Sequence, residues 1–194
     1  MNVQTDPSVA EFADYSARLQ GALRQADLRA VGELARAMLD CWRTDKSVYF
    51  CGNGGSAGNA THLANDFVYG IAKGKGPGMR AHALSANSSI LTCLANDLDY
   101  SEIYAAQLQV YGRKGDLLIA LSGSGNSPNI LKALETARVL QMKSFAILGY
   151  SGGKALQMAD VPIHFPIDDM QISEDLQLVV GHMVMQWLYA NRGA

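Results

Sequence analysis

Short apolar runs alternate along the chain with longer stretches in which apolar residues recur every three or four positions. The short runs predict five strands, at residues 47–51, 80–85, 116–121, 144–148 and 161–165. The longer stretches predict helices at residues 8–24, 28–43, 57–71, 101–112 and 128–141. Short strands that are apolar on both faces and alternate with helices are typical of a parallel sheet covered on both sides. The pattern therefore predicts an α/β fold in which helices flank a five-stranded parallel sheet.

No change in composition marks a second domain, so residues 1–194 are expected to form one domain. It divides into N-terminal helices at 8–43, an α/β core at 47–168 and a long C-terminal helix at 170–190. The last helix has more apolar surface than one face of one subunit needs. Its apolar residues are Leu176, Val179, Val180, Met183, Val184, Trp187 and Leu188. This surplus predicts that the helix packs against further copies of the chain.

Two turns rich in glycine and serine each leave a predicted strand and enter a helix, at residues 51–56 and 122–128. Small residues let backbone N–H groups approach an anion, and the positive end of the following helix strengthens the attraction. In the second turn, Ser127 is the expected cap of a helix that begins at Pro128. Ligands of open α/β sheets bind beyond the carboxyl ends of the strands. We therefore expect both turns to line one pocket for a phosphorylated small molecule; the alternative is that the glycines only connect strand to helix.

Two pairs of histidine and carboxylate residues lie on predicted helices. His62 and Asp66 are four residues apart, about 40° around a helix, and Glu174 and His182 are eight apart, about 80° around a second helix. Two histidines and two acids suit zinc or a similar divalent ion. They equally suit a general acid and base. The spacing leaves both alternatives open.

Other polar residues carry weaker signals. Asn96 and Asp97 follow the apolar run 90–95, where they would reach a sugar hydroxyl or simply form a turn. Asp168 and Asp169 are expected in a solvated loop before the last helix. The strand histidines at positions 82 and 164 are expected to be packed or at the surface rather than catalytic.

Composition narrows the class of protein. The 194 residues include 48% hydrophobic and 18% charged residues, with 16 basic against 18 acidic side chains and a net charge of -2. The absence of a basic stripe argues against nucleic acid as a partner. No apolar run approaches the roughly 20 residues that span a bilayer, and the first seven residues lack a secretory pattern, so we expect a cytoplasmic protein without membrane contact. Cys41, Cys51 and Cys93 are interpreted as buried thiols in a reducing compartment.

The motifs at 51–56 with His62, and at 121–127, resemble the sugar isomerase (SIS) domain in its phosphoheptose isomerase branch. The similarity runs through nearly the whole chain and ends in the terminal helix with His182. It implies a homotetramer of SIS domains whose sites are shared between subunits. It also implies that serine hydroxyls and backbone N–H groups hold the phosphate of a sugar phosphate: Ser56, Ser122, Ser124 and Ser127, with Gly123 and Gly125. The residues implied to face the sugar are Asn53, Gly54, Gly55, Asp66, Asn96, Asp97 and Glu174.

The resemblance implies a reaction and a cofactor. The reaction is the conversion of sedoheptulose 7-phosphate to D-glycero-D-manno-heptose 7-phosphate, for the heptose of surface polysaccharide. The cofactor is one divalent metal ion, zinc, on His62, Asp66, Glu174 and His182. Two residues depart from the family pattern, which has Glu at position 66 and Gln at position 174. Asp66 is shorter by one methylene and falls roughly 1 Å short as a base, so either Asp66 or Glu174 is the expected base, with His182 as acid partner.

Three alternatives accompany this prediction. Isomerisation of another sugar phosphate is open because of the departures at positions 66 and 174. Replication-initiator-associating proteins share the SIS fold as tetrameric scaffolds, and residues 56–60 resemble their segment. Those scaffolds tend to lose the metal and catalytic side chains, whereas His62 and His182 are present here. A sugar-phosphate-sensing regulator would bring a DNA-binding domain, for which the chain leaves no room. The residues therefore favour an enzyme.

Overall fold

A computed structural model describes residues 6–191; the remaining residues, including most of the N-terminal segment without a secretory pattern, lie outside this description. Within the described range, five strands form one parallel sheet in the order β2-β1-β3-β4-β5. They are β1 (Ser47–Gly52), β2 (Arg80–Ala83), β3 (Leu117–Ser122), β4 (Lys143–Leu148) and β5 (Val161–His164). Each strand begins and ends within two residues of its predicted bounds. The predicted α/β fold is confirmed.

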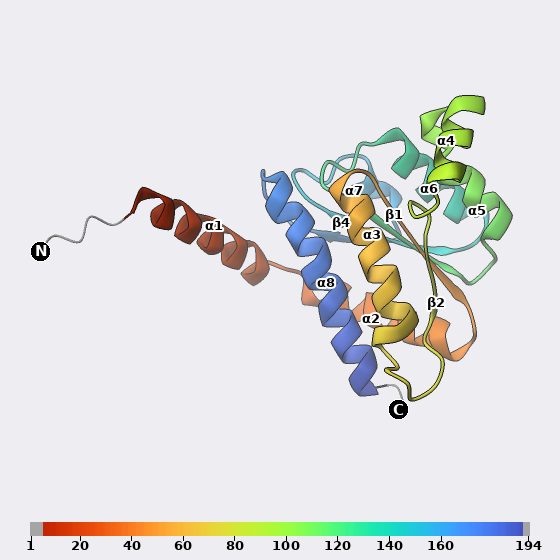
Figure 1. The fold of residues 1–194 in the computed structure, drawn as a ribbon, viewed down its shortest axis with the longest axis horizontal. Coiled ribbons are helices and arrows are strands. Elements are labelled where there is room, and N and C mark those ends of the chain that lie inside the picture. The colour runs from red at the N-terminus through yellow and green to blue at the C-terminus, as the bar shows by residue number, and fades with distance from the viewer. Residues whose placement is uncertain (1–5, 192–194) are drawn as a thin grey trace, which may run out of the picture.

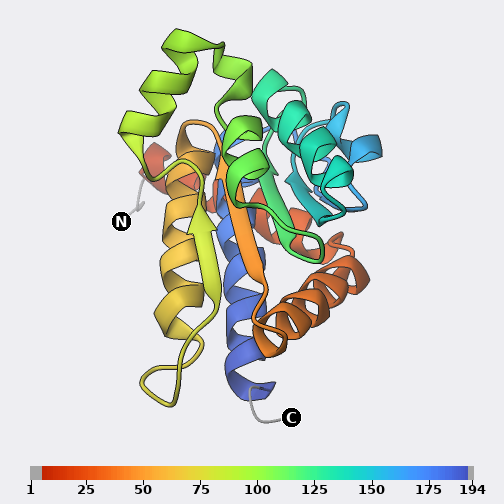
Figure 2. The ribbon, with the colours of Figure 1, turned by 90° about the vertical axis from the view of Figure 1, so that its right-hand side faces the viewer.

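Helices cover both faces of the sheet because its strands are apolar on both sides. Val48 and Phe50 of β1 join one core cluster, and the alternate residues Tyr49 and Cys51 join the other. The first cluster is closed by α2 (Leu28–Arg43), α3 (Gly55–Asn65) and α8 (Met170–Asn191). The second is closed by α5 (Ala105–Tyr111), α6 (Pro128–Val139) and α7 (Ala155–Met158). The helices α3 and α8 run side by side along the molecule (Figures 1 and 2).

The first helix, α1 (Pro7–Arg24), projects away from the rest of the molecule (Figure 1). None of its residues is buried, and Phe12 is 70% exposed. It contacts residues at the start of α8: the Tyr15 hydroxyl donates a hydrogen bond to Asp175 (2.6 Å), and Arg18 forms an ion pair with Asp169. Tyr15, Leu19 and Leu23 pack against the first core cluster, whereas Val9 and Phe12 are exposed. The apolar side is therefore open to a partner only in the first half of the helix.

The chain between β2 and β3 differs from the prediction. Residues Ser88–Asp97 form a helix, α4, whose cap Asn87 accepts hydrogen bonds from the two amides of Ser89 and Ile90. Asn96 and Asp97, expected after an apolar run either to reach a sugar hydroxyl or to form a turn, therefore lie in the last turn of a helix. The predicted helix 101–112 is divided into a 3₁₀ turn, η2 (Tyr100–Glu102), and α5. The short helix α7 was also not predicted.

The cysteine prediction is correct for two residues and wrong for the third. Cys41 and Cys51 are buried, and burial raises the pKa of Cys51 to about 12. Cys93 is exposed because α4 stands beyond the upper end of the sheet (Figure 2). A hydrogen bond to the carboxylate of Asp97 raises the pKa of Cys93. Among the described helices, none is both long and apolar enough to cross a membrane.

Candidate active site

The two glycine- and serine-rich turns meet at one edge of the sheet. Strands β1 and β3 are parallel neighbours, and Gly52 pairs with Leu121, so both turns leave the sheet at the same level. They line one hollow of about 280 Å³. Its walls are Asn53, Gly54, Gly55, Ser56, Leu121, Ser122, Gly123, Ser124, Ser127, Met170 and Glu174. The prediction that both turns share one cavity is confirmed.

Two serines of the second turn accept hydrogen bonds from backbone amides of the same turn. Ser122 Oγ accepts a hydrogen bond from the Gly125 amide (3.1 Å), and Ser124 Oγ accepts one from the Asn126 amide (3.3 Å). Ser127 occupies the predicted cap position of α6, but its side chain makes no capping bond. A hydroxyl group that accepts one hydrogen bond still has its own hydrogen, which it can donate to a ligand. The turn is therefore a set of donors, which suits an anion.

The backbone of the second turn requires glycine. Gly125 has a φ of +64°, and a Cβ there would lie 2.0 Å from the carbonyl oxygen of Gly152. The turn thus packs directly against the backbone of the loop after β4. Such close approach keeps the serines and the N-terminus of α6 at the rim of the hollow, where the helix end favours negative charge.

Glu174 places a carboxylate in the same hollow. This residue lies in the first turns of α8, and its side chain rests against Gly55 at the start of α3. A Cβ at position 55 would lie 2.3 Å from Glu174 Oε2, so only glycine leaves room for the carboxylate. The hollow therefore combines neutral hydrogen-bond donors with one acidic side chain, an arrangement that suits an anionic ligand with a base beside it.

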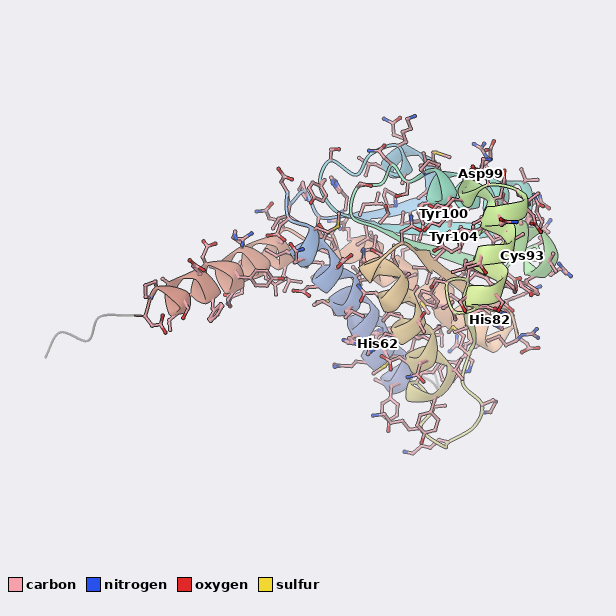
Figure 3. The ribbon with its side chains drawn as sticks, turned by 45° about the horizontal axis from the view of Figure 1, so that its top comes forward. His62, His82, Cys93, Asp99, Tyr100 and Tyr104 are labelled. Atoms are coloured by element: carbon pink, nitrogen blue, oxygen red, sulfur yellow. The ribbon has the colours of Figure 1, made fainter. Side chains whose placement is uncertain are left out.

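Asn53 is held rigidly at the rim of the hollow. Its amide pairs reciprocally with that of Asn129, which is 1% exposed, at 2.9 and 2.7 Å. The hydroxyls of Tyr100 and Tyr104 each lie 3.3 Å from Asn53 Oδ1, and Figure 3 shows both tyrosines at the α4 end of the molecule. With Oδ1 occupied, the second Nδ2 hydrogen remains for a ligand. No sequence pattern pointed to Asn129 or to the tyrosines.

Two histidines and an aspartate gather on the seam between α3 and α8. His62 Nε2 lies 3.1 Å from His182 Nε2, and both nitrogens lie 3.4 Å from Asp66 Oδ2. Asp66 begins a π-helical turn, η1 (Asp66–Gly70), that follows α3; π-turns frequently occur at functional sites. Figure 3 shows His62 on this seam, away from the two tyrosines.

The spacing of these three atoms fits one tetrahedral metal ion. Metal–ligand bonds of about 2.0–2.2 Å place neighbouring tetrahedral ligands about 3.3–3.6 Å apart. The observed separations of 3.1 and 3.4 Å lie close to that range. His62, Asp66 and His182 could therefore supply one face of a coordination tetrahedron, with the fourth ligand coming from elsewhere.

The close approach of α3 and α8 at this point depends on Gly181, the neighbour of His182. A Cβ at Gly181 would lie 2.2 Å from Cδ2 of Leu63, the neighbour of His62. Leu63 is buried at 1% exposure. The glycine thus lets the two helices come near enough for the histidine nitrogens to meet.

Glu174 does not join this group within one chain, which corrects the expected four-residue metal site. The grouped side chains are His62, Asp66 and His182. The reason is helix geometry: eight residues rise about 12 Å along α8, so Glu174 and His182 lie more than two turns apart. Angular proximity on the helix did not take this rise into account.

Other predicted site residues lie elsewhere. Asn96 and Asp97 hydrogen-bond with each other and are not part of the hollow's walls. Asp169, expected in a solvated loop, instead caps α8: its Oδ1 accepts from the Ile172 amide (3.0 Å). That backbone hydrogen bond, followed by the one from Arg18, lowers the pKa of Asp169.

The strand histidines lie outside the serine-lined hollow. His164 Nε2 lies 2.9 Å from the Tyr150 carbonyl oxygen. His82 stacks on Tyr49, and burial lowers its pKa. The rings of His82 and Tyr49 line a larger hollow, of about 670 Å³, at the β2 edge of the sheet. That hollow contains none of the serine turns and no acidic side chain among its lining residues.

Gln177 is the residue of this site that sequence reasoning noticed but did not use. It interrupts the apolar run of the last helix, is 1% exposed, and donates from Nε2 to Ser56 Oγ (3.0 Å). The available signal was an amide residue in an otherwise apolar run of the last helix, because a polar side chain in such a position needs a hydrogen-bond partner.

Comparisons with known proteins agree with this geometry. Residues 11–149 match the model of the SIS domain family. A phosphoheptose isomerase of Chlorobaculum parvum is 38% identical over 95% of this chain and 90% of its own. Solved phosphoheptose isomerases of Neisseria gonorrhoeae (TM-score 0.86, 29% identity) and Francisella tularensis (TM-score 0.88, 26% identity) are each covered over 97% of their chains, with 95% of this chain aligned. The chain therefore belongs to the SIS domain family, in its phosphoheptose isomerase branch.

Proposed function

We propose that this protein converts D-sedoheptulose 7-phosphate to D-glycero-D-manno-heptose 7-phosphate in the cytoplasm, as a step toward heptose for surface polysaccharide. The observation that carries the proposal is the Glu174 carboxylate in the same hollow as two serine-rich turns. Aldose–ketose isomerisation needs a base beside a bound phosphorylated sugar. The similarity to phosphoheptose isomerases over nearly the whole chain supports this substrate, and the free thiols support a reducing compartment.

The serine turns hold the phosphate in this proposal. The hydroxyls of Ser56, Ser122, Ser124 and Ser127 donate to its oxygens, helped by the backbone N–H groups of Gly123 and Gly125. The N-termini of α3 and α6 stabilise its negative charge. Asn53, Gly54 and Gly55 then face the sugar chain.

Glu174 is the proposed base. It removes a proton from C1 of the ketose and returns one to C2, while a proton moves from O1 to O2. Asp66 is the poorer candidate, because it lies beside His62 and His182 in the candidate metal site. Coordination to a metal ion lowers the basicity of a carboxylate. His182 is assigned to the same site rather than to acid catalysis, since its Nε2 faces His62 Nε2.

We assign one divalent ion, zinc, to His62, Asp66 and His182. When bound beside the substrate, such an ion stabilises negative charge on the sugar oxygens. Metal analysis of protein purified without chelator is expected to give one equivalent per chain, lost in the His62→Ala, His182→Ala double variant. If neither zinc, manganese, nickel nor cobalt binds, the triad is a hydrogen-bonded group and no metal takes part.

We further propose a homotetramer with sites shared between chains. Glu174 and His182 lie about 12 Å apart along α8. An ion that would stabilise the oxygens next to the carbons on which Glu174 acts would therefore have to be held by a neighbouring subunit. The unburied α1 and the exposed side chains of Met183 and Trp187 support such packing. Co-expression of Glu174→Gln with His182→Ala chains tests this. Mixed assemblies are expected to regain part of the activity that both homomeric variants lack, whereas no regain, or a stable monomer in sedimentation, would contradict shared sites.

NMR of sugar phosphates in deuterated water tests the reaction. Wild type is expected to interconvert the two heptose phosphates and to introduce deuterium at C1 or C2, and Glu174→Gln to do neither. The double variant Asp66→Glu, Glu174→Gln carries the family's residues at both positions and is expected to regain activity, which controls for loss of fold. Absence of exchange with any heptose, hexose or pentose phosphate, together with capture of a replication initiator, would favour the scaffold alternative.

A further inference from the structure

Two side-chain amides, one from α3 and one from α8, are hydrogen-bonded in series to the serine of the first turn. Ser56 is 4% exposed and lines the hollow, and Gln177 on α8 is 1% exposed. Gln177 Nε2 donates to Ser56 Oγ (3.0 Å), and Asn59 Nδ2 on α3 donates to Gln177 Oε1 (3.0 Å). Three polar side chains from two helices are therefore connected in series and end at the proposed phosphate site.

The direction of these hydrogen bonds follows from chemistry. Asn59 Nδ2 also donates to the backbone carbonyl oxygen of Glu174 (2.9 Å), and a carbonyl oxygen can only accept. This contact fixes which end of the Asn59 amide carries the hydrogens. Asn59 in turn fixes Oε1 of Gln177 towards itself, so Gln177 must turn its NH₂ group to Ser56. Ser56 Oγ then accepts from Gln177, and its own hydrogen is left for a ligand.

Two other serines of the hollow accept hydrogen bonds from the backbone rather than from a side chain. Ser122 and Ser124 accept from main-chain amides, which cannot be inverted. The partner of Ser56 is a side-chain amide, which can present either a donor or an acceptor. The polarity of Ser56 therefore depends on Gln177 and, through it, on Asn59.

We propose that Gln177 is a positioning residue that holds the Ser56 hydroxyl as a donor for an acceptor-only anion, the phosphate monoester group of the substrate. The inference rests on the proposed function for the identity of the substrate. Gln177 touches neither the phosphate nor the reacting carbons and acts through Ser56. It contributes to binding equally before and during the reaction, so its loss raises KM and leaves kcat nearly unchanged.

The test inverts the hydrogen bond with Gln177→Glu, which has nearly the same shape but can only accept. Ser56 then donates to the new carboxylate and presents lone pairs to the hollow. Binding of inorganic phosphate and of sedoheptulose 7-phosphate, measured by calorimetry, is expected to weaken by about ten-fold or more. Gln171→Glu is the matched control, because it adds the same charge to an exposed position of the same helix and is expected to bind both within about two-fold of wild type.

Ser56→Ala in wild type and in Gln177→Glu distinguishes loss of the Ser56 donor from repulsion of the anion by the new carboxylate. In wild type, Ser56→Ala is expected to weaken phosphate binding by about five-fold or more, because it removes a donor. In the Gln177→Glu background the hydroxyl no longer donates to the ligand, so the same substitution is expected to change binding by less than about two-fold. An equal loss in both backgrounds means that the carboxylate acts only by repulsion and overturns the proposal.

Asn59→Asp provides a second route if Gln177→Glu does not fold. An aspartate cannot donate to Gln177 Oε1, so the Gln177 amide turns over and presents its oxygen to Ser56. Phosphate binding is expected to weaken and KM to rise, again with little effect of Ser56→Ala; wild-type binding would overturn the proposal. Isomerisation by wild type, with unchanged phosphate binding in both variants, rejects the inference alone. Phosphate binding that depends on Gln177, without isomerisation of any sugar phosphate, rejects the proposed function alone.

Discussion

Replacing Gly181 by alanine tests whether the close approach of α3 and α8 brings the side chains of His62 and His182 together. Carbon atoms in contact lie about 3.5–4.0 Å apart. A Cβ at Gly181 would lie 2.2 Å from Leu63 Cδ2 and 2.9 Å from Leu63 Cδ1. The overlap at Cδ2 is therefore about 1.3–1.8 Å. Leu63 is 1% exposed, so it has little free space into which to turn, and the helices have to separate by about 1 Å.

The separation acts on both stability and metal binding. Overpacking of this kind costs about 1–3 kcal/mol of unfolding free energy. It also widens the distance between His62 Nε2 and His182 Nε2, which is 3.1 Å in the native protein. At about 4 Å the two nitrogens exceed the edge of a zinc tetrahedron. We expect zinc affinity to fall by about 10- to 100-fold, the range typical of changes around metal ligands.

Two measurements check this prediction: zinc titration by calorimetry and urea unfolding in the presence of chelator. The double variant Leu63→Ala, Gly181→Ala is the control, since it removes the side chain with which the new methyl collides. It is expected to bind zinc more tightly than Gly181→Ala, although the cavity at Leu63 costs about 2–5 kcal/mol. Wild-type zinc affinity in Gly181→Ala, with unfolding unchanged, would refute the argument that this contact positions the histidines.

Three further predictions concern the hollow and the start of α8. Gly55→Ala is expected to displace the Glu174 carboxylate, whose Oε2 would lie 2.3 Å from the new Cβ, and so to abolish deuterium exchange while retaining phosphate binding. Ser124→Ala is expected to cost about 1–3 kcal/mol of phosphate binding in calorimetry; unchanged affinity would place the phosphate elsewhere. Asp169→Ala is expected to lower the unfolding free energy by about 1 kcal/mol at pH 7 by loss of the cap. Because the folded pKa of Asp169 is lowered, its contribution is present above the ordinary value of 3.8 and is lost as pH falls through the folded pKa. The difference between wild type and variant, measured by thermal unfolding, should therefore shrink in acid, and a difference that is constant with pH would contradict this.

The sheet was predictable from the sequence because each strand carries its own signal. Runs such as 117–121 are apolar on both faces and short, which excludes a surface helix and indicates a covered parallel strand. The secondary-structure prediction was wrong where the local pattern fitted more than one kind of element. Helix α4 has apolar residues at positions 90, 91, 94 and 95, a helical spacing that was interpreted only as an apolar run. Exposure of Cys93 could not be predicted, because it depends on where α4 lies relative to the sheet.

The sequence by itself determined the fold class, the two turns and their meeting at one edge of the sheet. Strands and helix starts depend on local patterns, and a general rule of α/β sheets places the ligand beyond the carboxyl ends of the strands. It also identified His62, Asp66 and His182 as chemically apt. Only the tertiary structure decided that these three meet while Glu174 lies with the serines. That division depends on the rise along α8 and on the contact between Gly181 and Leu63. Likewise, only the packing of α8 against α3 brings Gln177 to Ser56, across 121 positions of the chain. Such contacts depend on how whole helices are placed, and no local pattern encodes that placement.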